Sequence, residues 1–206
     1  MSPFSACYAI LCLVMANTSR ILNLAFAVFL ASAVFSGSAL IAERGIAGSM
    51  RAEELLEELQ RPELPNWQRV EDALWSEWSK SGSAAMDLLL RRGRDAIEAE
   101  EYDAAIGHLT ALVDHAPDFA EAYNSRALAY YRSGLYGPAL GDLAHTLALN
   151  PRHFGALTGL GTILEEIGQE DRALGAYRAA RAIHPHDPDL EDAVHRLEIV
   201  TSGRTL

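Results

Sequence analysis

The chain has 206 residues, half of them apolar, and a formal net charge of −11 at neutral pH. This acidity excludes nucleic acids and anionic lipid headgroups as main partners, because both bind to basic surfaces. The two cysteines, Cys7 and Cys12, lie in the apolar N-terminus. Neither a disulfide framework nor a thiolate metal site is therefore expected in the rest of the chain.

Residues 1–42 are predicted to be a targeting segment. Arg20 is the single charged side chain in this stretch, and every acidic residue of the chain follows it. An apolar run at 21–35 comes directly after the arginine, and small residues at 37–39 suit a signal peptidase site. This order is typical of a secretory signal peptide whose true start lies near Met15.

Two alternatives to a cleaved signal stay open. Residues 21–42 carry no charge and are long enough to cross roughly 30 Å of hydrocarbon as a helical membrane anchor. The apolar run at 4–15 could also pair with them in a membrane hairpin. A cleaved signal and a single anchor both place the rest of the chain outside the cytoplasm, and we expect a bacterial periplasm.

Residues 43–83 are predicted to form a helical preface. An acidic helix is expected at 52–60, with its glutamates on a solvated face and Pro62 ending it. A second helix is expected at 67–79, with Asn66 as its N-cap. This helix carries three tryptophans: Trp67, Trp75 and Trp78. We expect them to cover the otherwise exposed end of the first of the repeats that follow, and the alternative is a separate aromatic docking site.

Residues 84–187 contain three ungapped repeats of 34 residues, at 86–119, 120–153 and 154–187. Alanine recurs at the twentieth position and helix-ending proline at the thirty-second, as Ala105, Ala139 and Ala173 and as Pro117, Pro151 and Pro185. Gly134 and Gly168 stand at the fifteenth position, where glycine ends a first helix. Each repeat is therefore predicted to be a helical hairpin that must stack on its neighbours to bury its apolar face.

This pattern resembles the tetratricopeptide repeat family. The second repeat carries the clearest match, with Tyr123, Ala127, Gly134, Ala139 and Pro151 at the family's positions. The resemblance covers about half of the chain. It implies an all-α fold, a right-handed superhelical solenoid of three 34-residue helix-turn-helix repeats with N-terminal helices and a C-terminal capping helix.

Two parts of this solenoid depart from the repeat pattern. In the first repeat Glu100 replaces the inter-helix glycine, and we expect a looser turn there. Residues 188–206 are predicted to form the capping helix and a short tail. The apolar face of that helix is expected to contain Leu190, Val194, Leu197 and Val200.

The sequence supports no catalytic residue, no metal site and no cofactor. The carboxylates lie on predicted solvated faces, and no serine has a Gly-x-Ser-x-Gly setting. His184, His186 and Asp187 could offer ligands to a metal, but alternate residues of an extended turn usually diverge. They also stand at an inter-repeat turn, like His153, where polar residues belong. The chain is therefore predicted not to be an enzyme, and a metal-dependent activity at this turn is the least favoured alternative.

The resemblance implies that the first helices of the repeats line a concave groove that binds a protein or peptide. The residues that it places there are Leu90, Arg94, Asn124, Leu128, Tyr131, Arg132, Thr158, Thr162 and Glu165. Tyr131 and Arg132 are the strongest candidates, because aromatic residues and arginine dominate interface energetics. Tyr131 could instead pack between neighbouring helices. The basic and asparagine clamp by which some family members hold a chaperone's C-terminal carboxylate is not matched.

The sequence thus predicts an exported, non-enzymatic adaptor or scaffold whose groove binds a protein or peptide in the bacterial cell envelope. The alternative is a membrane-anchored structural subunit, held through residues 21–42, that associates through its tryptophans as well as its groove. The pattern leaves the partner, the pathway and the oligomeric state open.

Overall fold

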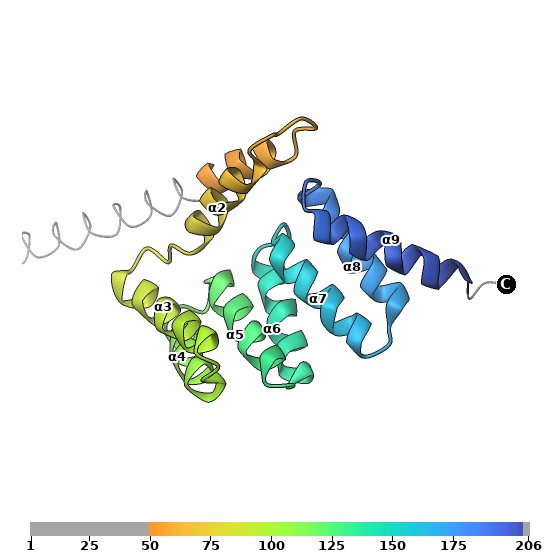
Figure 1. The fold of residues 1–206 in the computed structure, drawn as a ribbon. Coiled ribbons are helices and arrows are strands. Elements are labelled where there is room, and N and C mark those ends of the chain that lie inside the picture. Colours follow the sequence, from red (N-terminus) through yellow and green to blue (C-terminus); the bar gives the residue numbers. More distant parts are fainter. Residues whose placement is uncertain (1–49, 204–206) are drawn as a thin grey trace, which may run out of the picture. The chain divides into compact units, whose positions relative to one another are not determined.

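A computed structural model describes residues 50–203, and every regular element within them is an α-helix (Figure 1). The predicted all-α repeat fold is therefore confirmed. No helix in this range is both long and apolar enough to cross a membrane. The predictions made for residues 1–42 lie outside the described residues.

The helices follow one another through short turns. A first helix at 50–59 precedes α2 (Trp67–Trp78), α3 (Ala84–Glu98), α4 (Tyr102–His115), α5 (Ala120–Arg132), α6 (Tyr136–Leu149), α7 (Phe154–Glu166), α8 (Glu170–Ile183) and α9 (Pro188–Gly203). The pairs α3–α4, α5–α6 and α7–α8 each form a helical hairpin (Figure 1). They correspond in order to the three repeats of the sequence.

The two helices of a hairpin approach closely where small residues stand at the eighth repeat position. A Cβ added to Gly93 would lie 2.5 Å from Cγ of Leu109 on the second helix. At the same place in the third repeat, a Cβ on Gly161 would lie 2.8 Å from the ring of Tyr177. Any side chain at these two positions would force the helices apart, so the sequence pattern reports a real packing constraint.

The turn inside each hairpin is closed in the same way, which corrects the expectation for the first repeat. Gly134 and Gly168 have φ of +74°, and Glu100 adopts φ of +60° at the matching position. The backbone N–H after each of the three donates to a carbonyl five residues earlier, at 2.8 Å in every case. The turn at Glu100 is therefore as tight as the others, and a non-glycine residue carries the cost of its left-handed backbone.

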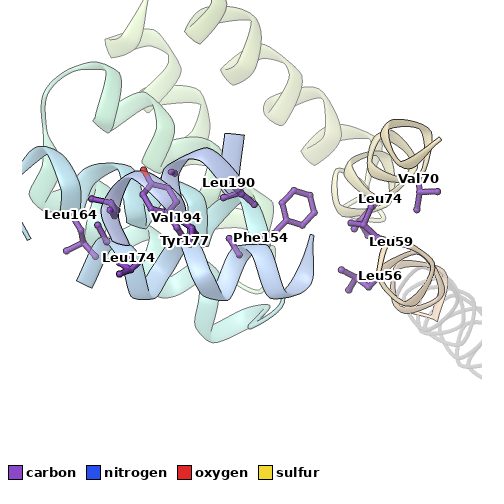
Figure 2. Packing of buried hydrophobic residues seen from close by; sticks show 14 of the residues in the cluster. Leu56, Leu59, Val70, Leu74, Phe154, Leu164, Leu174, Tyr177, Leu190 and Val194 are labelled. Carbon is purple, nitrogen blue, oxygen red and sulfur yellow. The ribbon is translucent and has the colours of Figure 1, made fainter. Parts of the chain in front are cut away.

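Helix 50–59 and α2 lie side by side in Figure 1, and we call them the N-terminal helix pair. Their apolar faces are buried and belong to the same hydrophobic cluster as residues of α7, α8 and α9. Figure 2 shows the two contributions, with Leu59 and Leu74 on the pair and Phe154 and Leu190 on the third repeat and the cap. The pair therefore packs against the C-terminal half of the described chain.

This packing corrects the prediction for the tryptophans. Trp75 and Trp78 contact Phe154, at ring-centroid distances of 5.3 Å each, and Trp67 contacts His184 at 5.2 Å. The first repeat, which they were expected to cover, contributes none of these aromatic contacts. The tryptophans of α2 are anchors of an intramolecular interface with the third repeat.

Polar contacts hold the N-terminal helix pair along the turns between repeats. Glu53 pairs with Arg152 at 2.5 Å. The carbonyl of Arg61 lies 2.8 Å from Nε2 of His186, and Gln60 donates to the carbonyl of Ala182 at 3.4 Å. Each partner on the repeats lies at or next to the turn that follows α6 or α8. The pair thus bridges two successive inter-repeat turns.

The last helix covers the end of the third repeat as predicted, with one difference. Leu190, Val194 and Leu197 are buried on its inner face together with Ala193, but Val200 is exposed. Asp187 accepts the backbone N–H of Asp189 at 2.9 Å and so satisfies a free donor in the first turn of α9.

Candidate functional site

A groove of about 360 Å³ lies between α2, α5 and α7, and we call it the α5–α7 groove. Its lining combines residues of these helices with one residue from α6 and one from the turn before α9. They are Glu71, Trp75, Asn124, Ala127, Leu128, Tyr131, Leu143, Phe154, Gly155, Thr158, Gly159, Thr162, Ile163 and Asp187. An apolar floor with a few polar groups around it is the usual composition of a binding pocket.

Trp75 forms one wall of the α5–α7 groove, and the position of its indole ring requires a glycine on α7. An ideal Cβ on Gly155 would lie 2.4 Å from Cη2 of Trp75, so a side chain there would displace the indole. The indole N–H donates to Glu71 at 3.3 Å, one turn earlier on α2. Trp75 also meets His153 edge-on, with ring centroids 5.4 Å apart. The wall is thus fixed by contacts on several sides.

A buried carboxylate, Glu121, ties α3, α5 and α7 together at the end of this groove. It is 2 % exposed, accepts from Arg94 of α3 at 2.6 Å and lies 2.9 Å from Nε2 of His153. Arg94 also donates to Ser79 at the end of α2, at 2.9 Å. One carboxylate therefore links the first helix of each repeat and, through the arginine, the N-terminal helix pair.

The proton position on His153 follows from its two partners. The ring is fully buried, and its Nδ1 accepts the backbone N–H of Ala156, which caps the start of α7. In the neutral ring the proton is then on Nε2, which donates to Glu121. Trp78 stacks on the ring, with centroids 4.4 Å apart. His153 thus connects the cap of α7, the buried carboxylate and α2.

The charge of Glu121 is maintained against the cost of burial. Burial by itself raises the pKa of this carboxyl, but the hydrogen bond from His153 and the positive charge of Arg94 outweigh it, so the pKa lies below its ordinary value. Ser125 donates to the same carboxylate at 3.0 Å, and Asn124 donates from its amide nitrogen at 3.3 Å. Since a carboxylate only accepts, these contacts also fix the orientation of the Asn124 amide.

At the other end of the groove Tyr131 donates its hydroxyl hydrogen to Glu166, at an O···O distance of 2.5 Å. This hydrogen bond, together with partial burial, raises the pKa of Tyr131 to about 12. The ring of Tyr131 stacks on Tyr136, with centroids 6.0 Å apart. Tyr131 therefore both lines the groove and packs on the next helix, and its role in binding stays a prediction.

Comparison with known proteins agrees with this architecture. The tetratricopeptide repeat model matches residues 90–145 and 139–188. A tetratricopeptide repeat-containing protein of Rhizobium etli is 32 % identical over 92 % of this chain and 97 % of its own length. The chain belongs to the tetratricopeptide repeat family. Human serine/threonine-protein phosphatase 5 is 29 % identical over 49 % of this chain, but that match covers 20 % of the phosphatase.

Solved tetratricopeptide repeat domains share the fold. The Sgt2 domain from Aspergillus fumigatus has a TM-score of 0.56 at 21 % identity, covering 60 % of this chain and 83 % of that domain. The first such domain of Spaghetti (RPAP3), bound to the HSP90 peptide SRMEEVD, has a TM-score of 0.55 at 20 % identity, covering 57 % and 93 %. Tetratricopeptide repeats are generally a non-enzymatic protein-interaction module, and this is the class of function that family membership gives the chain.

The structure brings five of the nine residues predicted for the groove into its lining: Asn124, Leu128, Tyr131, Thr158 and Thr162. The other four lie elsewhere. Leu90 is 2 % exposed in the core of the first repeat, and Arg94 is paired with Glu121. Arg132 is exposed outside the lining, and Glu165 pairs with Arg196 of α9. Repeat position alone could not show that a neighbouring element already engages a side chain.

The contribution of α2 and the role of His153 were not predicted from the sequence. Glu71 and Trp75 line the groove although they precede the repeats. The sequence does contain an indication of this contact at the second repeat position. The first two repeats have Asp87 and Glu121 there, whereas the third repeat has Gly155. A glycine on a helix surface indicates a close approach, here by Trp75. His153, expected as a polar turn residue, is fully buried.

The polar side chains of the turn that was considered for a metal lie in three different surroundings. His184 is buried between Trp67 and Phe154, its Nε2 lies 3.5 Å from Glu71, and neither ring nitrogen has a hydrogen-bond partner among the described residues. His186 faces the carbonyl of Arg61, and Asp187 caps α9. Within residues 50–203 no three metal-ligand side chains converge.

Proposed function

We propose that this protein is a non-enzymatic adaptor that holds a segment of a partner protein in the α5–α7 groove. One observation carries the proposal: Leu128 is 43 % exposed and lines a groove whose other lining residues are buried or half-buried. An exposed leucine in a concave apolar site costs solvation free energy until a partner covers it. The volume suits one large side chain together with the adjoining backbone.

Two structural neighbours support the use of a repeat groove for peptides. One is described as the first tetratricopeptide repeat domain of Spaghetti bound to an HSP90 peptide, and another as the TPR2B domain of yeast Sti1 in complex with Hsp70. Both are under 25 % identical to this chain, so they support groove binding as a mode and do not identify a partner.

We also propose that the adaptor works outside the cytoplasm, in the bacterial cell envelope. The support is the order of charge, apolar run and small residues in 1–42. Mass determination of the N-terminus of the mature protein tests it: a start near Leu40 supports a cleaved signal. An intact apolar segment instead supports the membrane-anchored subunit, although association through the tryptophans is disfavoured because Trp75 and Trp78 already pack on Phe154.

Site-specific photo-cross-linking in cells tests the groove directly. A photoreactive residue replaces Leu128 in one variant and Leu149, which is exposed to a similar extent at the end of α6, in a matched control. We expect a defined protein adduct from position 128 that is absent from position 149. A Tyr131→Ala, Arg132→Glu variant that stays helical is expected to lose the same partner in a pull-down.

The contrary result is equally clear. Equal adducts from positions 128 and 149 would place the interface outside the groove. No adduct at either position, with the protein expressed and folded, would contradict the adaptor proposal.

A further inference from the structure

The polar side chains of the α5–α7 groove donate their hydrogens within the protein. The amide nitrogen of Asn124 donates to Glu121, and the hydroxyl of Tyr131 donates to Glu166. Thr158 donates to the carbonyl of Phe154 at 2.9 Å. Apart from the second amide hydrogen of Asn124, what these groups leave for a ligand is therefore their oxygen lone pairs.

The remaining polar side chains of the lining show the same property. Thr162 donates to the carbonyl of Thr158 at 3.1 Å, and the indole N–H of Trp75 donates to Glu71. Glu71 and Asp187 are the charged residues of the lining, and no lysine or arginine belongs to it in the described part of the chain. The side chains around the apolar floor thus present acceptors and negative charge.

From this arrangement we infer that the groove selects a partner segment with a bulky apolar side chain flanked by lysine or arginine. The apolar side chain covers Leu128, while ammonium or guanidinium groups donate to the acceptors along the rim. The inference rests on the proposed function, because it names the chemistry of the segment that the groove would hold. The overall charge of −11 adds a long-range attraction for a basic partner.

The same acceptors and negative charge exclude an acidic C-terminal peptide of the kind seen with a structural neighbour. The peptide SRMEEVD bound to the Spaghetti domain carries three acidic residues near its end. Such a segment requires donors and positive charge, whereas this groove offers Glu71 and Asp187. Of the two arginines predicted to line the groove, Arg94 is engaged by Glu121 at 2.6 Å and Arg132 lies outside the lining.

Selection from a phage-displayed random peptide library on the full-length protein tests the inference. Each selected peptide is then tested on a Leu128→Gln variant, which removes the apolar contact without changing the charge and keeps the fold because Leu128 is exposed, as circular dichroism would verify. We expect peptides that share an apolar residue next to lysine or arginine and that bind the parent but not the variant. Their affinity is expected to fall as salt rises.

A charge-neutralising variant gives a second readout. Glu71→Gln keeps an acceptor for the Trp75 indole and removes the charge, so the selected basic peptides are expected to bind about three- to fivefold more weakly. Glu57→Gln, an equal change of net charge on the exposed face of helix 50–59, is expected to leave their binding unchanged.

The outcomes separate this inference from the function on which it rests. Groove-dependent peptides that are acidic, or that bind through a free C-terminus, would overturn the inference and leave the adaptor proposal standing. Peptides that bind the Leu128→Gln variant as well as the parent would count against both. Self-association of the parent that the Leu128→Gln variant loses would name a second copy of the chain as the occupant and overturn the inference.

Discussion

The three repeats and the N-terminal helix pair are both built from short amphipathic helices, yet they differ in how their packing is encoded. Within a repeat, Gly93 and Gly161 face Leu109 and Tyr177 on the partner helix at a fixed distance along the chain. The pair instead buries Leu59 and Leu74 in one cluster with Phe154 and Leu190, far away in sequence. The same apolar pattern thus specifies a local partner in one region and a distant one in the other.

This difference shows where the groove acquires its individual character. The repeats supply a generic concave surface, as in any protein of this family. The N-terminal helix pair adds the Trp75 wall and Glu71 to that surface. In the proposed binding mode, specificity therefore depends on an element outside the repeats, which is attached through His153, Arg152 and the turn before α9.

Removing a core side chain from a repeat is expected to have the largest effect. Leu109 is fully buried against Gly93, so Leu109→Ala opens a cavity between α3 and α4 and is expected to cost about 3 kcal/mol of unfolding free energy. Urea unfolding followed by circular dichroism measures it. Leu149→Ala, at an exposed leucine, is the matched control and is expected to change the free energy by less than about 0.5 kcal/mol. Equal effects would mean that the hairpin crossing does not limit stability.

Replacing the buried carboxylate of Glu121, which joins the two regions, is expected to have the second largest effect. Glu121→Gln removes the charge that Arg94 and His153 surround, and is expected to cost about 2–3 kcal/mol at pH 7. Because the pKa of Glu121 is lowered in the folded protein, its stabilising effect is complete above pH 4.5 and is lost as the pH falls below that value.

Urea unfolding of parent and Glu121→Gln at a series of pH values checks both the size and the sign. The difference in unfolding free energy should shrink as the pH falls from 7 towards 3. Glu98→Gln, at an exposed carboxylate of α3, should show no such pH-dependent difference. A difference that grows in acid would contradict the assignment of an ionised Glu121.

The fold was predictable because its determinants recur every 34 residues, and the groove was predictable only in part. Positions such as Leu128 and Thr158 follow from the repeat alone. The burial of Leu90 and the pairing of Glu165 with Arg196 depend on neighbouring elements whose position the repeat does not specify. The placement of α2 against the third repeat is likewise set by long-range contacts, of which Gly155 is a visible trace in the sequence.

Weakening the N-terminal helix pair is expected to affect that region alone. Trp78→Ala removes the ring stacked on His153. It is expected to weaken the packing of the N-terminal helix pair on the third repeat by about 2 kcal/mol. Hydrogen exchange should become faster in helix 50–59 and α2, while α3–α6 keep their protection. Ser76→Ala, on the exposed side of α2, is the control. Loss of protection throughout the repeats would show that the pair is an integral part of the solenoid.

The smallest expected effect compares the turns of the repeats themselves. Glu100 has φ of +60° where the other two repeats have glycine, and its hydrogen-bonded turn is the same. Glu100→Gly relieves the left-handed strain and is expected to raise the unfolding free energy by about 1 kcal/mol, partly offset by the greater freedom of glycine in the unfolded chain. The reciprocal change Gly134→Glu should lower it by a similar amount. Thermal unfolding of both variants measures the two changes in unfolding free energy. A different result would be that Glu100→Gly leaves the unfolding free energy unchanged while Gly134→Glu lowers it. Contacts of the Glu100 side chain would then offset the backbone strain of the first turn, and the three repeats would not be equivalent at this position.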